Sequence, residues 1–145
     1  MAKKELYTIF MARMTEAHEA GYHFESSWYS YAILEDRLRS LLRSSGGEGV
    51  GGPGKPIRMM GPKLKELKHR AKSDQLLKVN FDHDRLNLWK NSRNDLMHAM
   101  ADASMSLEQI KNEAKSLSEE GAKLVRLLSD SARRVKAHRS KVKIT

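Results

Sequence analysis

The sequence predicts an all-α fold, a helical bundle without a sheet, and three observations lead to this expectation. No segment shows the alternation of apolar and polar residues that is typical of a strand. Several segments instead repeat apolar residues every three or four positions, between glycines and helix-capping residues. The chain has 145 residues and no cysteine, and a chain of this length can bury enough surface to fold without disulfides. We therefore expect one domain over residues 1–145.

The boundaries of the helices follow from local signals. Gly21 ends a first helix, because glycine favours the left-handed conformation that closes helices. Ser26 and Ser27 are candidate N-caps for a second helix, and Pro62 suits the first turn of a short basic helix. A further helix starts near Asp82 or Asp84 and a last one follows Ser106. The expected helices cover residues 3–20, 27–43, 62–72 and 82–102, together with a closing helix from 107 onward.

The closing helix has the clearest pattern. Ser106 and Gln109 form a capping box, in which each side chain bonds the backbone N–H of the other residue. An apolar seam with helical spacing follows, and it predicts packing against the rest of the domain or against a second copy of the chain. Gly121 lies in this seam although glycine costs a helix about 1 kcal/mol relative to alanine. The seam consists of Leu107, Ile110, Ala114, Leu117, Gly121, Leu124 and Leu128.

Glycine and proline gather between the second and third expected helices. Six of the nine glycines and two of the three prolines fall between Gly46 and Pro56. Such a composition predicts a long flexible loop, here over residues 46–61. Residues 136–145 form a basic tail at the C-terminal end.

The formal net charge of +9 and the pI of about 9.9 favour an anionic partner. Nucleic acid is the simplest partner, and a charge kept for solubility is the alternative. No apolar segment follows Met1 as in a signal peptide, and no run is long enough to span a membrane, so we expect a cytoplasmic protein without membrane contact. The candidate RNA-binding residues are Lys63, Lys65, Lys68 and Arg70 in the short basic helix, and Arg133 and Arg134 near the C-terminus; a solvated helix face and a frayed tail would explain them equally.

Two opposite charges interrupt apolar helix faces. Glu35 lies within the arc formed by Trp28, Tyr31, Ala32, Leu38 and Leu42. Arg93 lies within the arc formed by Leu86, Trp89, Leu96, Met97 and Met100. Because an unpaired buried charge is costly, we expect Glu35 and Arg93 to form an ion pair. The pair would either fix the docking of two helices or orient Arg93 toward a phosphate.

Arg93, Asn94 and His98 form the segment Arg-Asn-Asp-Leu-Met-His. This segment resembles the Arg-Asn-x-x-x-His signature of the HEPN family, a family of all-helical nucleotide-binding domains of higher eukaryotes and prokaryotes. The order of the expected helices is also similar to a HEPN up-and-down bundle, and Glu35 lies where the family often has an acidic residue on an early helix. Many HEPN domains are metal-independent ribonucleases of toxin, phage-defence and RNA-guided immune systems.

The resemblance implies an endoribonuclease that needs no metal and no cofactor. In such a reaction the 2′-hydroxyl of RNA attacks the adjacent phosphate, and a histidine is suited to moving the protons near neutral pH. His98 would be the general acid or base, Arg93 would hold the scissile phosphate, and Asn94 would orient His98 or the ribose. One histidine does not easily serve both sides of the phosphate. The resemblance therefore implies a homodimer whose two motifs line one cleft.

The alternative is a non-catalytic HEPN-like module that binds nucleic acid or a protein partner, because some HEPN domains lack activity. An antitoxin or another defence protein is the kind of partner that the resemblance suggests. Met100 departs from the pattern, since the antitoxin-paired branch usually has a tyrosine two residues after the histidine. This departure is an argument against that branch.

Overall fold

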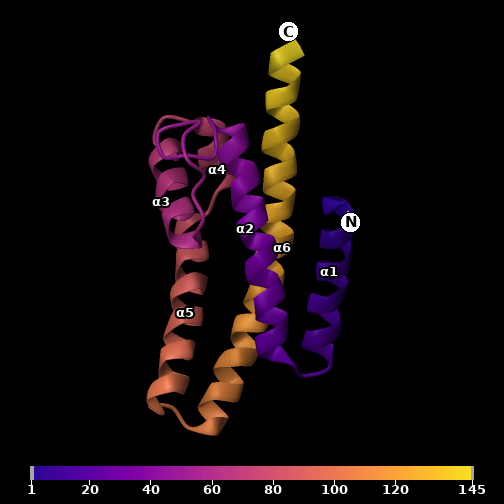
Figure 1. The fold of residues 1–145 in the computed structure, drawn as a ribbon, viewed down its shortest axis with the longest axis vertical. Helices are drawn as coiled ribbons and strands as arrows, with labels where there is room; N and C mark the ends of the chain where they lie inside the picture. The colour runs from indigo at the N-terminus through magenta and orange to yellow at the C-terminus, as the bar shows by residue number, and fades with distance from the viewer. Residues whose placement is uncertain (1, 145) are drawn as a thin grey trace. The chain divides into compact units, whose positions relative to one another are not determined.

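A computed structural model describes residues 2–144, with the side chains of residues 2–141. This part of the chain is helical without a strand, apart from isolated bridges of Gly49 with Gly52 and Pro56, so the expected all-α fold is confirmed. Figure 1 traces the helices in chain order. They are α1 (Lys3–Glu19), α2 (His23–Ser44), α3 (Met60–Ala71), α4 (Gln75–Asn80), α5 (His83–Asp102) and α6 (Leu107–Ile144).

The local signals predicted some boundaries better than others. The capping box of α6 is present, because Gln109 N donates to Ser106 Oγ and Ser106 N donates to Gln109 Oε1. The predicted caps of α2 are wrong, since α2 already begins at His23 and Ser26 Oγ donates to the carbonyl oxygen of Met14. The short helix α4 was not predicted. Asp74 starts α4 by accepting a hydrogen bond from Leu77 N at 3.1 Å.

The predicted basic tail over residues 136–145 begins inside α6, which continues to Ile144. The side chains of residues 142–145, including Lys143, lie outside the described residues. The backbone of residues 136–144 is therefore helical and belongs to α6.

The chain forms two compact units. Unit 1 comprises residues 1–33 and 88–125, and unit 2 comprises residues 34–87 and 126–145. In unit 1, small polar side chains are buried where helices pack. Ser26, Ser30 and Ser118 each have 0% of their surface exposed, and Gly121 is also buried. Small side chains allow helix backbones to approach closely, which explains why these polar residues occupy the interior.

The indole ring of Trp89 packs closely against α6 at Gly121. The Trp89 indole Nε1 donates to the carbonyl oxygen of Leu117 at 2.9 Å, one turn before Gly121 on α6. A Cβ atom at Gly121 would lie 3.0 Å from Trp89 Cζ2 and 3.0 Å from Ser30 Oγ. This glycine therefore provides the space that the indole ring occupies.

Replacement of Gly121 by leucine is expected to lower the free energy of unfolding by about 1–3 kcal/mol, because the added side chain overpacks unit 1. Gly121→Ala should have a smaller effect, since a helix gains about 1 kcal/mol from alanine in place of glycine. Urea unfolding measures both variants, with Lys123→Leu as the control at an exposed position of the same helix. Equal stability of Gly121→Leu and the parent would contradict this packing role.

Two histidines of unit 1 lie side by side, with the ring centroids of His18 and His23 5.1 Å apart. His18 Nδ1 is 2.7 Å from Ser118 Oγ, whereas His23 Nδ1 is buried without a hydrogen-bond partner. Burial lowers the pKa of His23, and the nearby His18 and Lys115 lower it further, whereas Glu119 acts in the opposite direction. The folded protein therefore favours the neutral form of His23.

Stability is consequently expected to fall as the pH decreases below about 6.5, the ordinary pKa of an unfolded histidine. Below that value the unfolded chain binds a proton that folded His23 resists, so protonation favours unfolding. Urea unfolding at pH 8 and at pH 5.5 measures this loss. His23→Gln should lose less stability between the two pH values than the parent. If the stability of His23→Gln depends on pH as strongly as that of the parent, other titratable groups cause the loss.

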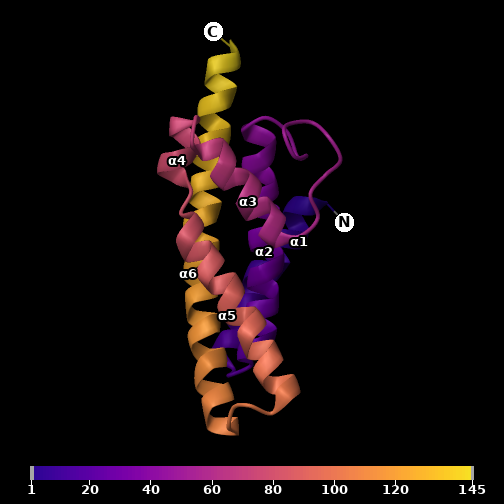
Figure 2. The same ribbon diagram turned by 90° about the vertical axis from the view of Figure 1, so that its left-hand side faces the viewer.

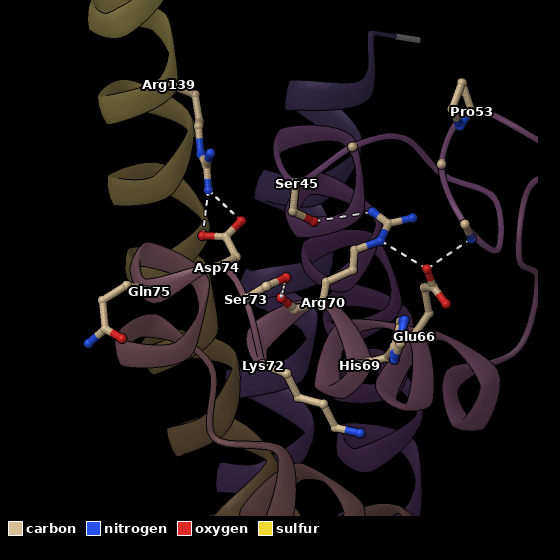
Figure 3. A pocket seen from close by; sticks show the side chains of 13 residues that line it. Ser45, Pro53, Glu66, His69, Arg70, Lys72, Ser73, Asp74, Gln75 and Arg139 are labelled. Atoms are coloured by element: carbon tan, nitrogen blue, oxygen red, sulfur yellow. Dashed lines mark hydrogen bonds and ion pairs between the residues drawn. The ribbon is translucent and has the colours of Figure 1, made fainter.

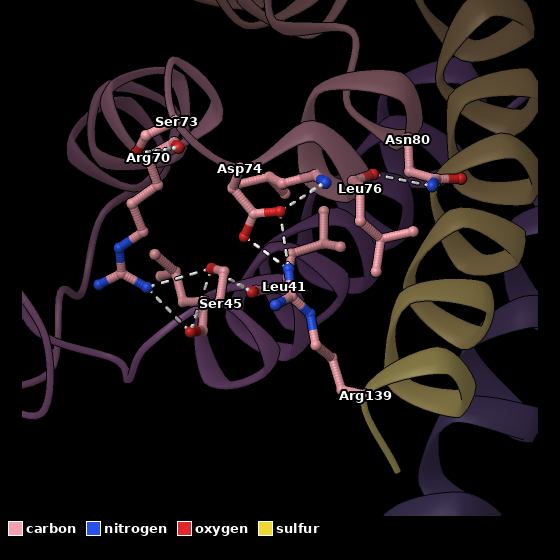
Figure 4. Close-up of polar contacts among 10 residues, drawn as sticks. Leu41, Ser45, Arg70, Ser73, Asp74, Leu76, Asn80 and Arg139 are labelled. Carbon is pink, nitrogen blue, oxygen red and sulfur yellow. Dashed lines mark hydrogen bonds and ion pairs between the residues drawn. The ribbon is translucent and has the colours of Figure 1, made fainter. Parts of the chain in front are cut away.

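Leucines from α2 and α3 form much of the core of unit 2. Leu38, Leu41, Leu42 and Leu67 are fully buried, as is Leu77 of α4. Figure 2 shows α4 beside the C-terminal part of α6, and polar contacts join these helices. Arg139 Nη2 donates to both carboxylate oxygens of Asp74, at 2.7 and 2.6 Å (Figure 4), and Arg134 Nε donates to Asn80 Oδ1 at 3.0 Å.

Arg70 of α3 anchors the glycine-rich segment between α2 and α3. Its guanidinium donates to the carbonyl oxygens of Leu42 and Gly49 and to Ser45 Oγ, over 2.7–3.2 Å. Its Nε also donates to Glu66 Oε1, which accepts a second bond from Gly51 N. Figure 3 shows this network at a pocket of unit 2. The network holds the segment at several points, and the predicted flexibility of residues 46–61 stays a prediction.

Candidate functional site

The three residues of the Arg-Asn-x-x-x-His motif all lie on α5 within unit 1. Asn94 and His98 are exposed, whereas Arg93 is half-buried. Asn94 and His98 are one helical turn apart, so they share a face of α5. Neither side chain has a hydrogen-bond partner among residues 2–141, whose side chains the structure describes, so both can meet a ligand from solvent.

Arg93 is positioned by an aromatic ring. Its guanidinium carbon lies 4.3 Å from the ring centroid of Tyr31, which is a cation–π distance. The Tyr31 ring in turn lies 6.5 Å from the ring of Trp89. No hydrogen bond or ion pair joins the Arg93 guanidinium to another residue of the described chain. The ring therefore orients the cation while its N–H donors stay available for an anionic ligand.

An aromatic surface accompanies Arg93 in unit 1. Phe24, Trp28 and Tyr31 follow helical spacing on one face of α2, and 72% of Trp28 is exposed. Trp28, which belongs to the apolar arc predicted for this helix, is therefore not part of the core. Met97 and Met100, which belong to the apolar arc predicted for α5, are exposed as well. The reason is that α2 buries its serine-containing face, which a hydrophobicity pattern does not identify as interior.

Glu35 and Arg93 each have a partner within their own unit, and the predicted ion pair between them stays a prediction. Glu35 Oε2 lies 3.6 Å from Lys63 Nζ in unit 2, and Arg93 lies on Tyr31 in unit 1. Glu35 is thus a neighbour of the basic helix α3. The sequence pattern missed both partners, because a tyrosine ring and a lysine from a short helix give no periodic signal.

The candidate RNA-binding residues fall into different environments. Lys65 and Lys68 are exposed on α3 and line an open pocket of ≈ 580 Å³ in unit 2. Arg133 and Arg134 are also exposed, although Arg133 pairs with Asp130 and Arg134 bonds Asn80.

Two of the candidates are not surface residues. The prediction that Arg70 binds RNA is corrected, because its side chain is only 9% exposed and its N–H donors bind groups of the protein itself. The side chain of Lys63 is buried as well, at 5% exposure.

Within residues 2–144, no helix is both long enough and apolar enough to cross a bilayer. The same part of the chain holds no group of three or more histidine, aspartate or glutamate side chains arranged to bind a metal ion. Comparison of the sequence with protein-family models, and of the chain with curated proteins and with solved structures, gave no match.

Proposed function

We propose that this chain is a metal-independent endoribonuclease of the HEPN type. The observation that carries the proposal is the guanidinium of Arg93, a half-buried residue. This group lies over the Tyr31 ring with its N–H donors unfilled, on the same helix as exposed His98. A guanidinium with free donors suits a phosphate, because its planar fork binds two oxygens at once. The proposal also uses the resemblance of Arg93, Asn94 and His98 to the HEPN motif.

The reaction would be an internal transesterification of RNA. The 2′-hydroxyl oxygen forms a bond to phosphorus while the bond to the 5′-oxygen breaks, which leaves a 2′,3′-cyclic phosphate and a free 5′-hydroxyl. Arg93 stabilises the negative charge that grows on the phosphate oxygens. His98 takes the proton of the 2′-hydroxyl or gives one to the 5′-oxygen. A homodimer would supply a second His98 for the other proton transfer.

The substrate that this surface favours is single-stranded RNA. Unpaired bases stack on exposed aromatic rings, and each stacked base contributes about 1–3 kcal/mol to binding. Trp28 and Phe24 offer such rings in the same unit as Arg93. Bases inside a duplex are not available for this contact.

The experiment that tests the proposal is cleavage of an end-labelled RNA by the purified protein in the presence of EDTA. We expect cleavage of single-stranded RNA, products that end in 2′,3′-cyclic phosphate, and much slower cleavage of the same sequence in a duplex. A matched DNA strand should remain intact because it lacks the 2′-hydroxyl. If single-stranded RNA stays intact at high protein concentration, the ribonuclease proposal fails.

A non-catalytic module that binds single-stranded nucleic acid is the second candidate, and the exposed ring of Trp28 supports it. This candidate requires binding without products, with an affinity that falls steeply as salt increases. Trp28→Ala should weaken binding in either case. Cleavage products therefore decide between the two candidates. A toxin or phage-defence role, with an antitoxin or another protein partner, remains a prediction based on the family resemblance.

A further inference from the structure

Unit 2 contains an open pocket of ≈ 790 Å³ whose lining is mainly cationic. Glu35 and Arg39 lie one turn apart on α2 and supply one part of this lining. Lys55 and Arg58 come from the end of the segment between α2 and α3, and Lys63 comes from the beginning of α3. Four cationic side chains and one carboxylate therefore line the pocket, and one of the cations, Arg39, is paired with Glu48.

Lys63 is the unusual member of this pocket. Its side chain is 5% exposed, and its ammonium lies 3.6 Å from Glu35 Oε2, which is longer than a hydrogen bond. No hydrogen bond joins this ammonium to another residue of the described chain. An ammonium has three N–H donors, and Glu35 at 3.6 Å is an ion-pair partner that fills none of them with a hydrogen bond. These donors are therefore available to a ligand in the pocket that accepts hydrogen bonds.

The surroundings of Lys63 favour an anionic ligand. Glu48 is not part of the lining, but it pairs with Arg39 of the lining and with Arg43, and these bonds lower the pKa of Glu48. Lys55, Arg58 and Lys63 are the other cations of the lining. The helix α3 begins near the pocket without a side-chain cap on its first N–H groups. The partial positive charge of such a helix start adds to that of the cations. Glu35 differs from these cations, because an ionised carboxylate accepts hydrogen bonds and donates none.

We infer that this pocket binds one ribose-phosphate unit of an RNA strand. Lys63, Arg58 and Lys55 bind the phosphate oxygens, and Glu35 accepts a hydrogen bond from the 2′-hydroxyl. The choice of RNA over a free nucleotide rests on the proposed function, because both ligands carry a phosphate beside a hydroxyl. The pocket would thereby hold the RNA in unit 2, separately from the Arg93 and His98 motif of unit 1.

The test is the binding of a fluorescein-labelled single-stranded RNA, followed by anisotropy. The chain carries His98→Ala throughout, so that cleavage does not interfere. Lys63→Met, which keeps an apolar stem of similar length, is expected to weaken binding tenfold or more. Arg58→Ala changes an exposed residue and should weaken binding about threefold. The control Lys78→Met removes an exposed charge from α4 in the same unit and should change the affinity by less than twofold.

Several outcomes would overturn the inference. Equal effects of Lys63→Met and Lys78→Met would show that only net charge matters, provided that circular dichroism finds both variants folded. If Lys63→Met does not fold, a lack of effect of Arg58→Ala overturns the inference instead. If the parent binds RNA and DNA of the same sequence with equal affinity, Glu35 does not accept a hydrogen bond from the 2′-hydroxyl. If AMP binds more tightly than the RNA and its binding depends on Lys63, the ligand of the pocket is a free nucleotide and not an RNA strand.

Failure of this inference and failure of the proposed function give different results. RNA binding that depends on Lys63, without cleavage by the parent chain, would support the pocket and reject the ribonuclease. Cleavage that depends on His98, with RNA binding unaffected by Lys63→Met, would reject the pocket and support the ribonuclease.

Discussion

His98→Ala is expected to reduce RNA cleavage by about 10²- to 10⁴-fold, the range that general acid–base catalysis contributes. The fold should not change, because His98 is exposed and has no hydrogen-bond partner among the described side chains of residues 2–141. Surface substitutions of this kind usually alter stability by less than about 0.5 kcal/mol. The rate of cleavage of a labelled RNA in EDTA measures the effect, together with the melting temperature.

The matched control for this prediction is His138→Ala, which removes another exposed histidine from α6. We expect this variant to cleave RNA at the rate of the parent. A His98→Ala variant that also cleaves at the parental rate would remove His98 from the mechanism. Loss of cleavage in both variants would point to a ribonuclease that contaminates the parent preparation.

Arg70→Met is expected to lower the free energy of unfolding by about 3–5 kcal/mol, the usual cost of removing one partner of a buried ion pair. Arg70 and Glu66 are 9% and 8% exposed, and Arg70 also satisfies the carbonyl oxygens of Leu42 and Gly49. Methionine fills a similar volume but donates no hydrogen bond. The Glu66 carboxylate would then keep only the Gly51 N–H, which together with Arg70 lowers its pKa in the parent.

Urea unfolding monitored by circular dichroism measures this loss. Lys65→Met is the control, because it removes a cation from an exposed position of the same helix and should cost less than about 0.5 kcal/mol. Proteolysis of the segment between α2 and α3 should also become faster in Arg70→Met, since the residue anchors that segment. An Arg70→Met variant as stable as Lys65→Met would contradict the anchoring role.

Local patterns in the sequence were enough to predict the all-α fold and most helix boundaries. The capping box of Ser106 and Gln109 is an example, because its hydrogen bonds connect residues three positions apart. Such signals depend only on neighbours along the chain. The motif of Arg93, Asn94 and His98 was likewise visible as a spacing, and helix α5 gives Asn94 and His98 a common face.

The partners of charged side chains were not predictable in this way, because they come from residues distant in the sequence. Arg93 lies on Tyr31, 62 positions before it, and Lys63 lies beside Glu35. Neither contact has a periodic signal. The exposure of Trp28 was missed for a related reason, since the buried face of α2 includes Ser26 and Ser30, which a hydrophobicity pattern assigns to solvent.

The sequence by itself therefore determined that this chain is helical, where most helices begin and end, and which residues form a candidate motif. Only the tertiary structure decided which charges are buried, which donors remain unfilled and which aromatic rings face solvent. The physical reason is that helix formation depends on hydrogen bonds and caps within a few residues. Burial and ion pairing depend on the packing of segments far apart in the chain.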